Sequence, residues 1–135
     1  PVFMAKRLSK ALRGKRRWVG VGFPSAIQDR SDAVSVIEAA FAHIRTEKGI
    51  RLMDFHEHSS AQGQTTQQHL EAEGSPIEPL SYGVLQVPHE IYSQVLELTR
   101  AEDSLKNRSI FSITSSGKIR LVRERLGLVR PPRRR

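Results

Sequence analysis

Apolar and polar residues follow a strand-like pattern in four segments of the chain. These segments either alternate between apolar and polar side chains or are rich in β-branched and aromatic residues, which indicates strands. The predicted strands are residues 18–23, 50–56, 82–87 and 108–114. In the first of them, Gly20 and Gly22 lie on the same side, so we expect a helix or a ligand backbone to pack closely there.

Three other segments have the period of a helix. Residues 31–48 place apolar side chains three and four positions apart and end in a lysine followed by Gly49, which predicts a long amphipathic helix. A second helix is predicted over residues 88–103, with Pro88 as its first residue. A short basic helix is predicted over residues 118–126.

Residues 57–81 fit neither pattern. They contain four glutamines between positions 62 and 68 and one large apolar residue before Ile77. We expect this polar insert to be a mobile loop, with a short helix at residues 67–72.

The order of elements is therefore β-α-β-β-α-β with an additional C-terminal helix. Two β-α-β halves with right-handed crossovers predict an α+β protein, a ferredoxin-like α/β sandwich whose antiparallel sheet carries helices on one face. We divide the chain into a basic N-terminal arm (1–17), a ferredoxin-like domain (18–127) and a basic C-terminal tail (128–135).

Positive charge is concentrated at the two ends of the chain. The net charge is +8, from 22 Lys+Arg and 14 Asp+Glu. Residues 1–17 contain seven basic side chains and no acidic one, residues 118–135 contain eight and one, and the remainder is acidic. Clustered lysines and arginines bind phosphate backbones through counterion release, so a polyanion is the first partner to consider. The alternative is that these charges are solvated and contact nothing.

Composition excludes several classes of protein. No apolar run approaches the roughly 20 residues that cross a bilayer. Without cysteine there is no disulfide, zinc-thiolate site or cysteine nucleophile. No apolar segment follows the basic N-terminus as in a secretory signal, so we expect a cytoplasmic protein, nuclear or nucleolar if it is eukaryotic.

The strongest local motif joins the last strand to the last helix. Serines and Gly117 lead into a helix start, where free backbone N–H groups and a glycine favour an anion. Ile119, Val122 and Leu126 form an inward stripe, which leaves a basic set for the outside: Lys118, Arg120, Arg123 and Arg125. The alternative is that Ser115 or Ser116 only caps the helix.

A second motif, Arg16-Arg17-Trp18, lies at the start of the first strand. Basic residues beside an aromatic ring suit a stacked base next to a bound phosphate. The alternative is that Trp18 closes the core. An RNA-recognition motif would need paired aromatics on the central strands, and the third strand offers only Tyr82.

The histidines do not indicate a catalytic site. His56, His58 and Asp54 lie close together in sequence, but no metal-ligand spacing is present. The serines lack the surroundings of a nucleophile. We therefore expect no catalytic residue, no metal site and no cofactor bound by the protein itself.

Over residues 15–127 the chain resembles the small ferredoxin-like protein subunit of archaeal and eukaryotic ribonuclease P, which is related to a subunit of ribonuclease MRP. The resemblance lies in Arg16-Arg17-Trp18, in Gly83-Val84-Leu85-Gln86, and in Ser116-Gly117-Lys118-Ile119-Arg120 with Arg123. Gln86 replaces the family's arginine, Lys118 replaces its threonine, and the insert of residues 57–81 is long.

The resemblance implies an accessory role. The RNA subunit, with bound Mg²⁺, cleaves the 5′ leader of precursor tRNA, while this protein supports the catalytic RNA and pairs with other protein subunits, one of them barrel-like. Structured RNA is then the partner, with no membrane and no small-molecule substrate. The expected RNA-binding residues are Lys10, Arg13, Lys15, Arg16, Arg17, Trp18, Ser116, Gly117, Lys118, Arg120, Arg123, Arg125, Arg130 and Arg133.

Three other functions fit the same sequence. A ribosomal protein would bind rRNA through the same basic extensions. A small metal-dependent nuclease would use His56, His58 and Asp54. A DNA-binding or purely structural adaptor would need only the charge.

Overall fold

The computed structural model of the 135-residue chain describes residues 16–46, 48–74 and 78–128. Most of the expected N-terminal arm and the C-terminal tail therefore lie outside the described residues. The elements, in chain order, are β1 (Arg16–Pro24), α2 (Arg30–Ala40), β2 (Arg51–His56), α3 (Ala61–Ala72), β3 (Leu80–Pro88), the 3-10 helix η1 (His89–Ile91), α4 (Tyr92–Thr99), α5 (Ser104–Arg108), β4 (Phe111–Ser116) and α6 (Ile119–Arg125). None of these helices is long and apolar enough to cross a membrane.

The four strands form one sheet in the order β2-β3-β1-β4, and every neighbouring pair is antiparallel. β1 and β3 are the central strands and contain most of the fully buried strand residues. The described chain is thus an α+β fold with a four-stranded antiparallel sheet and five α-helices, which is compatible with the predicted ferredoxin-like arrangement.

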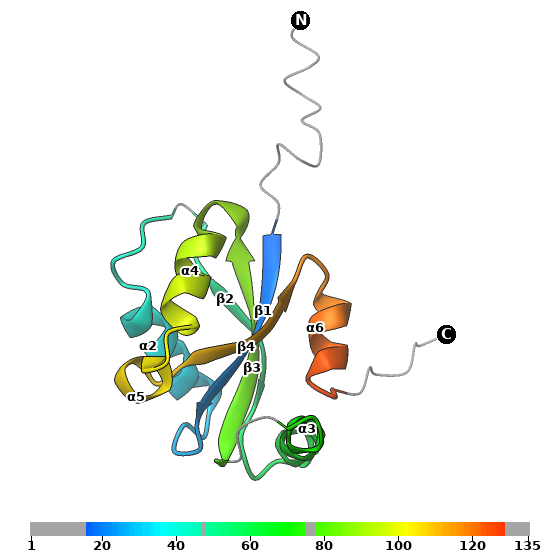
Figure 1. Ribbon diagram of the computed structural model, residues 1–135. Coiled ribbons are helices and arrows are strands. Elements are labelled where there is room, and N and C mark those ends of the chain that lie inside the picture. The colour runs from blue at the N-terminus through cyan, green and yellow to red at the C-terminus, as the bar shows by residue number, and fades with distance from the viewer. Residues whose placement is uncertain (1–15, 47, 75–77, 129–135) are drawn as a thin grey trace, which may run out of the picture.

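The main core lies between one face of the sheet, called here the first face, and the helices α2 and α4. Val19, Val21 and Phe23 alternate along β1 toward this face and are fully buried. They pack with Ile37 of α2 and Val95 of α4. Figure 1 shows α2, α4 and α5 together on this side of the sheet.

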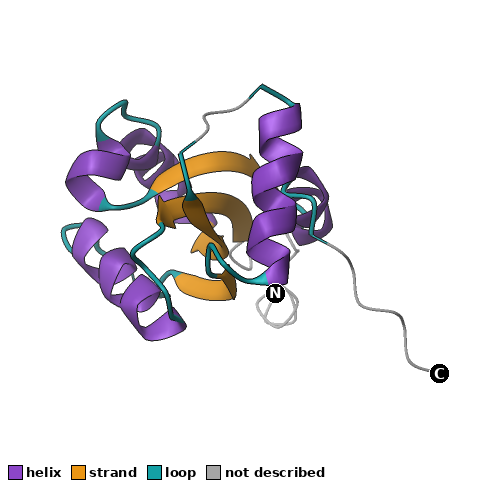
Figure 2. Cartoon of the chain, turned by 90° about the horizontal axis from the view of Figure 1, so that it is seen from below, coloured by secondary structure: helices purple, strands orange, loops and turns teal. Residues whose placement is uncertain are grey.

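The opposite face, called here the second face, is covered by α3 and α6, although helices were expected on one face only. Figure 2 shows the sheet between two groups of helices. The close packing of a helix, which was expected at Gly20 and Gly22, is confirmed only at Gly20; Gly22 faces Phe111 of the neighbouring strand β4. A Cβ at Gly20 would lie 3.0 Å from Cδ1 of Leu126, the residue that directly follows α6, and one at Gly22 would lie 2.6 Å from the ring of Phe111. The absent side chain of Gly20 therefore lets α6 sit directly on the sheet.

Within the polar insert, Ala61–Ala72 form the 12-residue helix α3, so the helix expected at 67–72 is present but longer, and the expectation of a loop was wrong for these residues. The Ser60 hydroxyl caps this helix by accepting a hydrogen bond from Gly63 N at 3.0 Å. The buried side chain of Gln67 then ties the helix to β3, because its Nε2 donates to Glu78 O at 3.0 Å and its Oε1 accepts from Leu80 N at 3.2 Å. Apart from Leu70, which is buried against Leu80 and Tyr82, polar contacts hold α3 in place, and its sequence therefore shows no apolar stripe.

Two predicted helix boundaries were wrong. The helix expected over 31–48 ends at Ala40, yet Phe41 and Ile44 still enter the core through the following turn, in which Ile44 N donates to Phe41 O. The helix expected over 88–103 is divided into η1, α4 and α5, and Ser109, with φ 61°, ends α5 in the left-handed conformation. The last strand consequently begins at Phe111 and not at residue 108.

Candidate nucleic-acid interface

The two basic motifs of the sequence meet at one corner of the sheet. β1 begins at Arg16, and its antiparallel neighbour β4 ends at Ser116, with Trp18 paired to Ser116. The start of the domain therefore lies beside the turn that leads into α6 (Figure 1). Segments about 100 residues apart in sequence are neighbours here because β1 and β4 run in opposite directions.

Strand alternation separates the side chains of Arg16-Arg17-Trp18, which the sequence motif had grouped. Trp18 and Arg16 lie on the second face, while Arg17 lies on the first. The Arg17 guanidinium is 5.6 Å from the ring centroid of Tyr92, and its Nη1 lies 2.8 Å from where a Cβ of Gly117 would be. Arg17 is therefore packed into the fold and does not share a surface with Trp18.

Arg17 carries an unusual buried nitrogen. Among the described residues its Nε is buried and has no hydrogen-bond partner. The aromatic ring below it is held by the Tyr92 hydroxyl, which donates to Ser115 Oγ at 2.7 Å. Gly117 thus serves to admit the guanidinium, a role that its place in the sequence motif does not reveal.

The turn between β4 and α6 is closed by a local hydrogen bond, and no side chain of the described residues caps the N-terminus of α6. The Ser116 hydroxyl accepts a hydrogen bond from Lys118 N at 3.1 Å, and α6 begins one residue later than predicted, at Ile119. The inward stripe of Ile119, Val122 and Leu126 is confirmed, since these residues pack on Val84 and Trp18 of the sheet.

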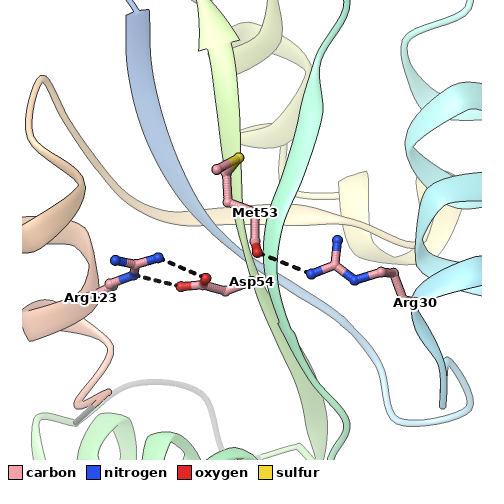
Figure 3. Close-up of polar contacts among 4 residues, drawn as sticks. All are labelled: Arg30, Met53, Asp54 and Arg123. Carbon is pink, nitrogen blue, oxygen red and sulfur yellow. Dashed lines mark hydrogen bonds and ion pairs between the residues drawn. The ribbon is translucent and has the colours of Figure 1, made fainter. Parts of the chain in front are cut away.

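The four basic residues assigned to the outside of α6 have different surroundings. Lys118 and Arg120 are exposed. Arg123, in contrast, forms a two-point ion pair with Asp54 of β2, with N–O distances of 2.8 and 2.9 Å (Figure 3). Arg125 is exposed but donates from Nη1 to Ser115 O at 2.9 Å. The outward prediction was therefore wrong for Arg123, because Asp54 attracts it to the sheet.

The edge strand β2 is held from two sides at a bulge between Leu52 and Asp54. On one side, Arg30 at the start of α2 donates to Leu52 O at 2.7 Å and to Met53 O at 3.1 Å. On the other side lies Arg123, as Figure 3 shows. Hydrogen bonding to Asp54 raises the pKa of Arg123. These contacts fix the distance between β2 and α6.

Two of the three side chains proposed for a metal have other partners. Asp54 is bonded to Arg123, and the His58 ring lies 3.1 Å from Leu80 O. Over the described ranges, no three His, Cys, Asp or Glu residues are grouped so that they could hold a metal ion.

His56 makes the fold sensitive to pH. Its pKa is lowered from 6.5, mainly by burial and further by Arg123 and Arg30, while Asp54 opposes the shift. Below about pH 6.5 the unfolded chain binds a proton that the folded chain resists, so the free energy of unfolding falls as the pH decreases. We expect His56→Gln to flatten this loss in urea unfolding between about pH 7.5 and about pH 5.5. An unchanged pH profile in the variant would contradict this assignment.

The structure adds two residues to the site that sequence reasoning did not select. Arg51 of β2 pairs with Gln86 of β3, which in turn pairs with Trp18 of β1. All three side chains therefore lie on the second face in one row across the sheet, with Arg51 on the edge strand opposite β4. Alternation within 50–56 placed Arg51 on one side of a strand, but only the strand register places it in the same row as Trp18.

Comparison of the chain with protein-family models, curated proteins and solved structures finds no match. The function of this corner is therefore inferred from its own residues and geometry.

Proposed function

We propose that this protein is a non-catalytic RNA-binding subunit of ribonuclease P, which supports the catalytic RNA in the 5′ maturation of precursor tRNA. The choice of ribonuclease P rests on the sequence resemblance over residues 15–127, and one structural observation supports RNA binding. The strand that follows the basic N-terminal segment begins beside the basic turn before α6, so two cationic motifs act on one ligand. We also propose that the fold is ferredoxin-like, because the strand order β2-β3-β1-β4 is that of two interleaved β-α-β units.

The exposed cations at this corner suit a phosphate backbone. Arg16, Lys118 and Arg120 are exposed, and none of them has a salt bridge within the described ranges. Side chains that are not bound to carboxylates remain available to neutralise phosphates. The basic residues Lys10, Arg13 and Lys15 immediately precede β1, and Arg130 and Arg133 follow α6; all five lie outside the described residues.

The remaining surface fits an accessory protein. The chain between the basic ends is acidic, which favours contacts with other protein subunits over RNA. The Mg²⁺ required for cleavage would be held by the RNA, and we assign no residue of this chain to it. A ribosomal protein is the second candidate, because rRNA would be bound by the same corner and the same extensions.

Purification of the tagged full-length protein from its native source, followed by sequencing of the associated RNA, tests the proposal. We expect the RNA of ribonuclease P, in amounts that fall when Arg16, Lys118 and Arg120 are changed together to Gln. A control with the exposed pair Arg100 and Lys106 changed to Gln should retain the RNA.

Each other outcome is decisive. Recovery of rRNA would support the ribosomal alternative, and recovery of no RNA would overturn RNA binding. Cleavage of precursor tRNA by the isolated protein, without any RNA subunit, would show that the protein is itself a nuclease.

A further inference from the structure

One side chain from each of the four strands forms a row across the second face. The row consists of Arg51 (β2), Gln86 (β3), Trp18 (β1) and Ser116 (β4), and each is the direct cross-strand partner of the next. α6 covers the adjacent row, where Gly20 pairs with Val84. The four residues, called here the Trp18 row, therefore form the end of the sheet face that α6 leaves accessible: Arg51 is exposed and the other three are partly exposed.

We propose that the Trp18 row binds an unpaired nucleotide of RNA, with the base stacked on the indole of Trp18 and its edge hydrogen-bonded by Gln86. The inference rests on the proposed function in taking RNA as the ligand. It goes further by specifying the form of RNA that is recognised and the direction in which it crosses the sheet.

The aromatic ring is held in position for stacking. Trp18 packs at its buried side on the cluster of Val84, Val122 and Leu126, so its orientation is fixed before a ligand arrives. A base that stacks on an aromatic ring gains binding energy whatever its identity. Beside the ring, the Gln86 amide offers both a donor and an acceptor to the exposed edge of a base.

Unpaired RNA fits this row better than a duplex does. In an A-form helix the base faces are stacked on each other and the major groove is too narrow to be read, so a flat row of side chains meets mainly the backbone. A single-stranded segment can turn its bases toward the sheet. Trp18 therefore selects RNA that is already unpaired, such as a loop or a bulge.

Cations lie at both ends of the Trp18 row. Arg51 occupies the β2 end, and Lys118 follows Ser116 at the β4 end. Arg120 lies one turn before Arg123 on α6, and therefore on the side of that helix which reaches β2. Phosphates on either side of a stacked nucleotide thus have a basic partner. The path of the RNA backbone therefore crosses the four strands between the β2 edge and the β4 edge of the sheet.

Acidic charge does not oppose a phosphate here. The row contains no acidic residue, and Asp54, which lies on the same face of β2, is neutralised by its two-point contact with Arg123. The ion pair thus removes a negative charge from the path of the RNA while it ties α6 to β2.

Tryptophan fluorescence tests the proposal directly, because Trp18 is the single tryptophan of the chain. The full-length protein is titrated with single-stranded oligoadenylate and with a blunt-ended RNA duplex that carries the same number of phosphates and no unpaired nucleotide. We expect the oligoadenylate to quench Trp18 on binding and the duplex to bind with little quenching. Equal quenching by both RNAs, or none by bound oligoadenylate, would overturn the inference.

Variants separate the Trp18 row from RNA binding in general. Trp18→Leu keeps an apolar side chain packed against α6 but removes the ring. It should weaken the binding of oligoadenylate about 10-fold in fluorescence anisotropy of labelled RNA, with the affinity for the RNA duplex unchanged. Trp18→Phe should recover most of the affinity. The matched control, Lys118→Gln with Arg120→Gln, should weaken both RNAs alike.

Failure of this inference and failure of the proposed function give different results. If the wild-type protein binds neither RNA, the proposed function is wrong and the inference falls with it. If both RNAs bind and Trp18→Leu changes neither affinity, only the Trp18 row is refuted. If thermal unfolding shows that Trp18→Leu does not fold, the double variant Arg51→Gln with Gln86→Ala replaces it in the same comparison of the two RNAs. Both of these side chains reach solvent, so we expect the double variant to fold.

Discussion

Deletion of residues 1–15 and 129–135 is expected to lower the affinity for structured RNA about 100-fold at physiological salt. The two segments carry nine of the 22 basic side chains. Each phosphate contact that is lost means that about one counterion fewer is released from the RNA on binding. The slope of log affinity against log salt should therefore become shallower in the shortened protein. Anisotropy titrations of labelled RNA over a series of salt concentrations measure both quantities.

Both cuts fall outside the described elements, so the deletion should leave the fold intact. β1 begins at Arg16 and α6 ends at Arg125, and thermal unfolding of the shortened protein should match that of the full chain. A full-length variant with the same nine residues changed to Gln separates the effect of charge from that of length. Unchanged affinity and salt slope in both proteins would show that the basic ends do not contact RNA.

The substitution Leu126→Ala is expected to lower the free energy of unfolding by about 2–5 kcal/mol. Leu126 is fully buried and packs directly on β1: a Cβ added at Gly20 would lie only 3.0 Å from Leu126 Cδ1. The sheet below cannot move up to fill the space, because β1 is hydrogen-bonded on both edges. Chemical denaturation followed by Trp18 fluorescence measures the loss, since Trp18 packs in the same cluster.

Leu121→Ala is the matched control for this substitution. It removes the same atoms from the same helix, but Leu121 is only partly buried and does not belong to the cluster under α6. We expect it to cost less than about 1 kcal/mol. Equal losses in the two variants would mean that α6 is not held to the sheet by Leu126.

The sequence predicted the fold where side-chain patterns are local. Alternation in β1 placed Gly20 and Gly22 on one side of that strand correctly, and the spacing of Ile119, Val122 and Leu126 identified the buried side of α6. The helix α3 could not be predicted in full, because a buried glutamine and a capping serine hold it and neither produces an apolar period.

The candidate site was predicted less completely, since it depends on contacts between distant segments. Asp54 and Arg123 are 69 residues apart, and nothing in their local sequence shows that they bind each other. Arg17 and Trp18 are adjacent in sequence but lie on opposite faces because a strand alternates. The register of β2 against β3, which brings Arg51 to Gln86, follows a bulge that the sequence does not mark.

The position of Arg30 also bears on how the protein behaves at high concentration. Edge strands expose backbone groups that pair readily with a strand of another molecule, which is a common route to aggregation. At the bulge of β2, the carbonyls of Leu52 and Met53 already accept hydrogen bonds from Arg30, and the bulge itself interrupts a flat edge. The arginine thereby protects this side of the sheet against edge-to-edge association between copies of the chain.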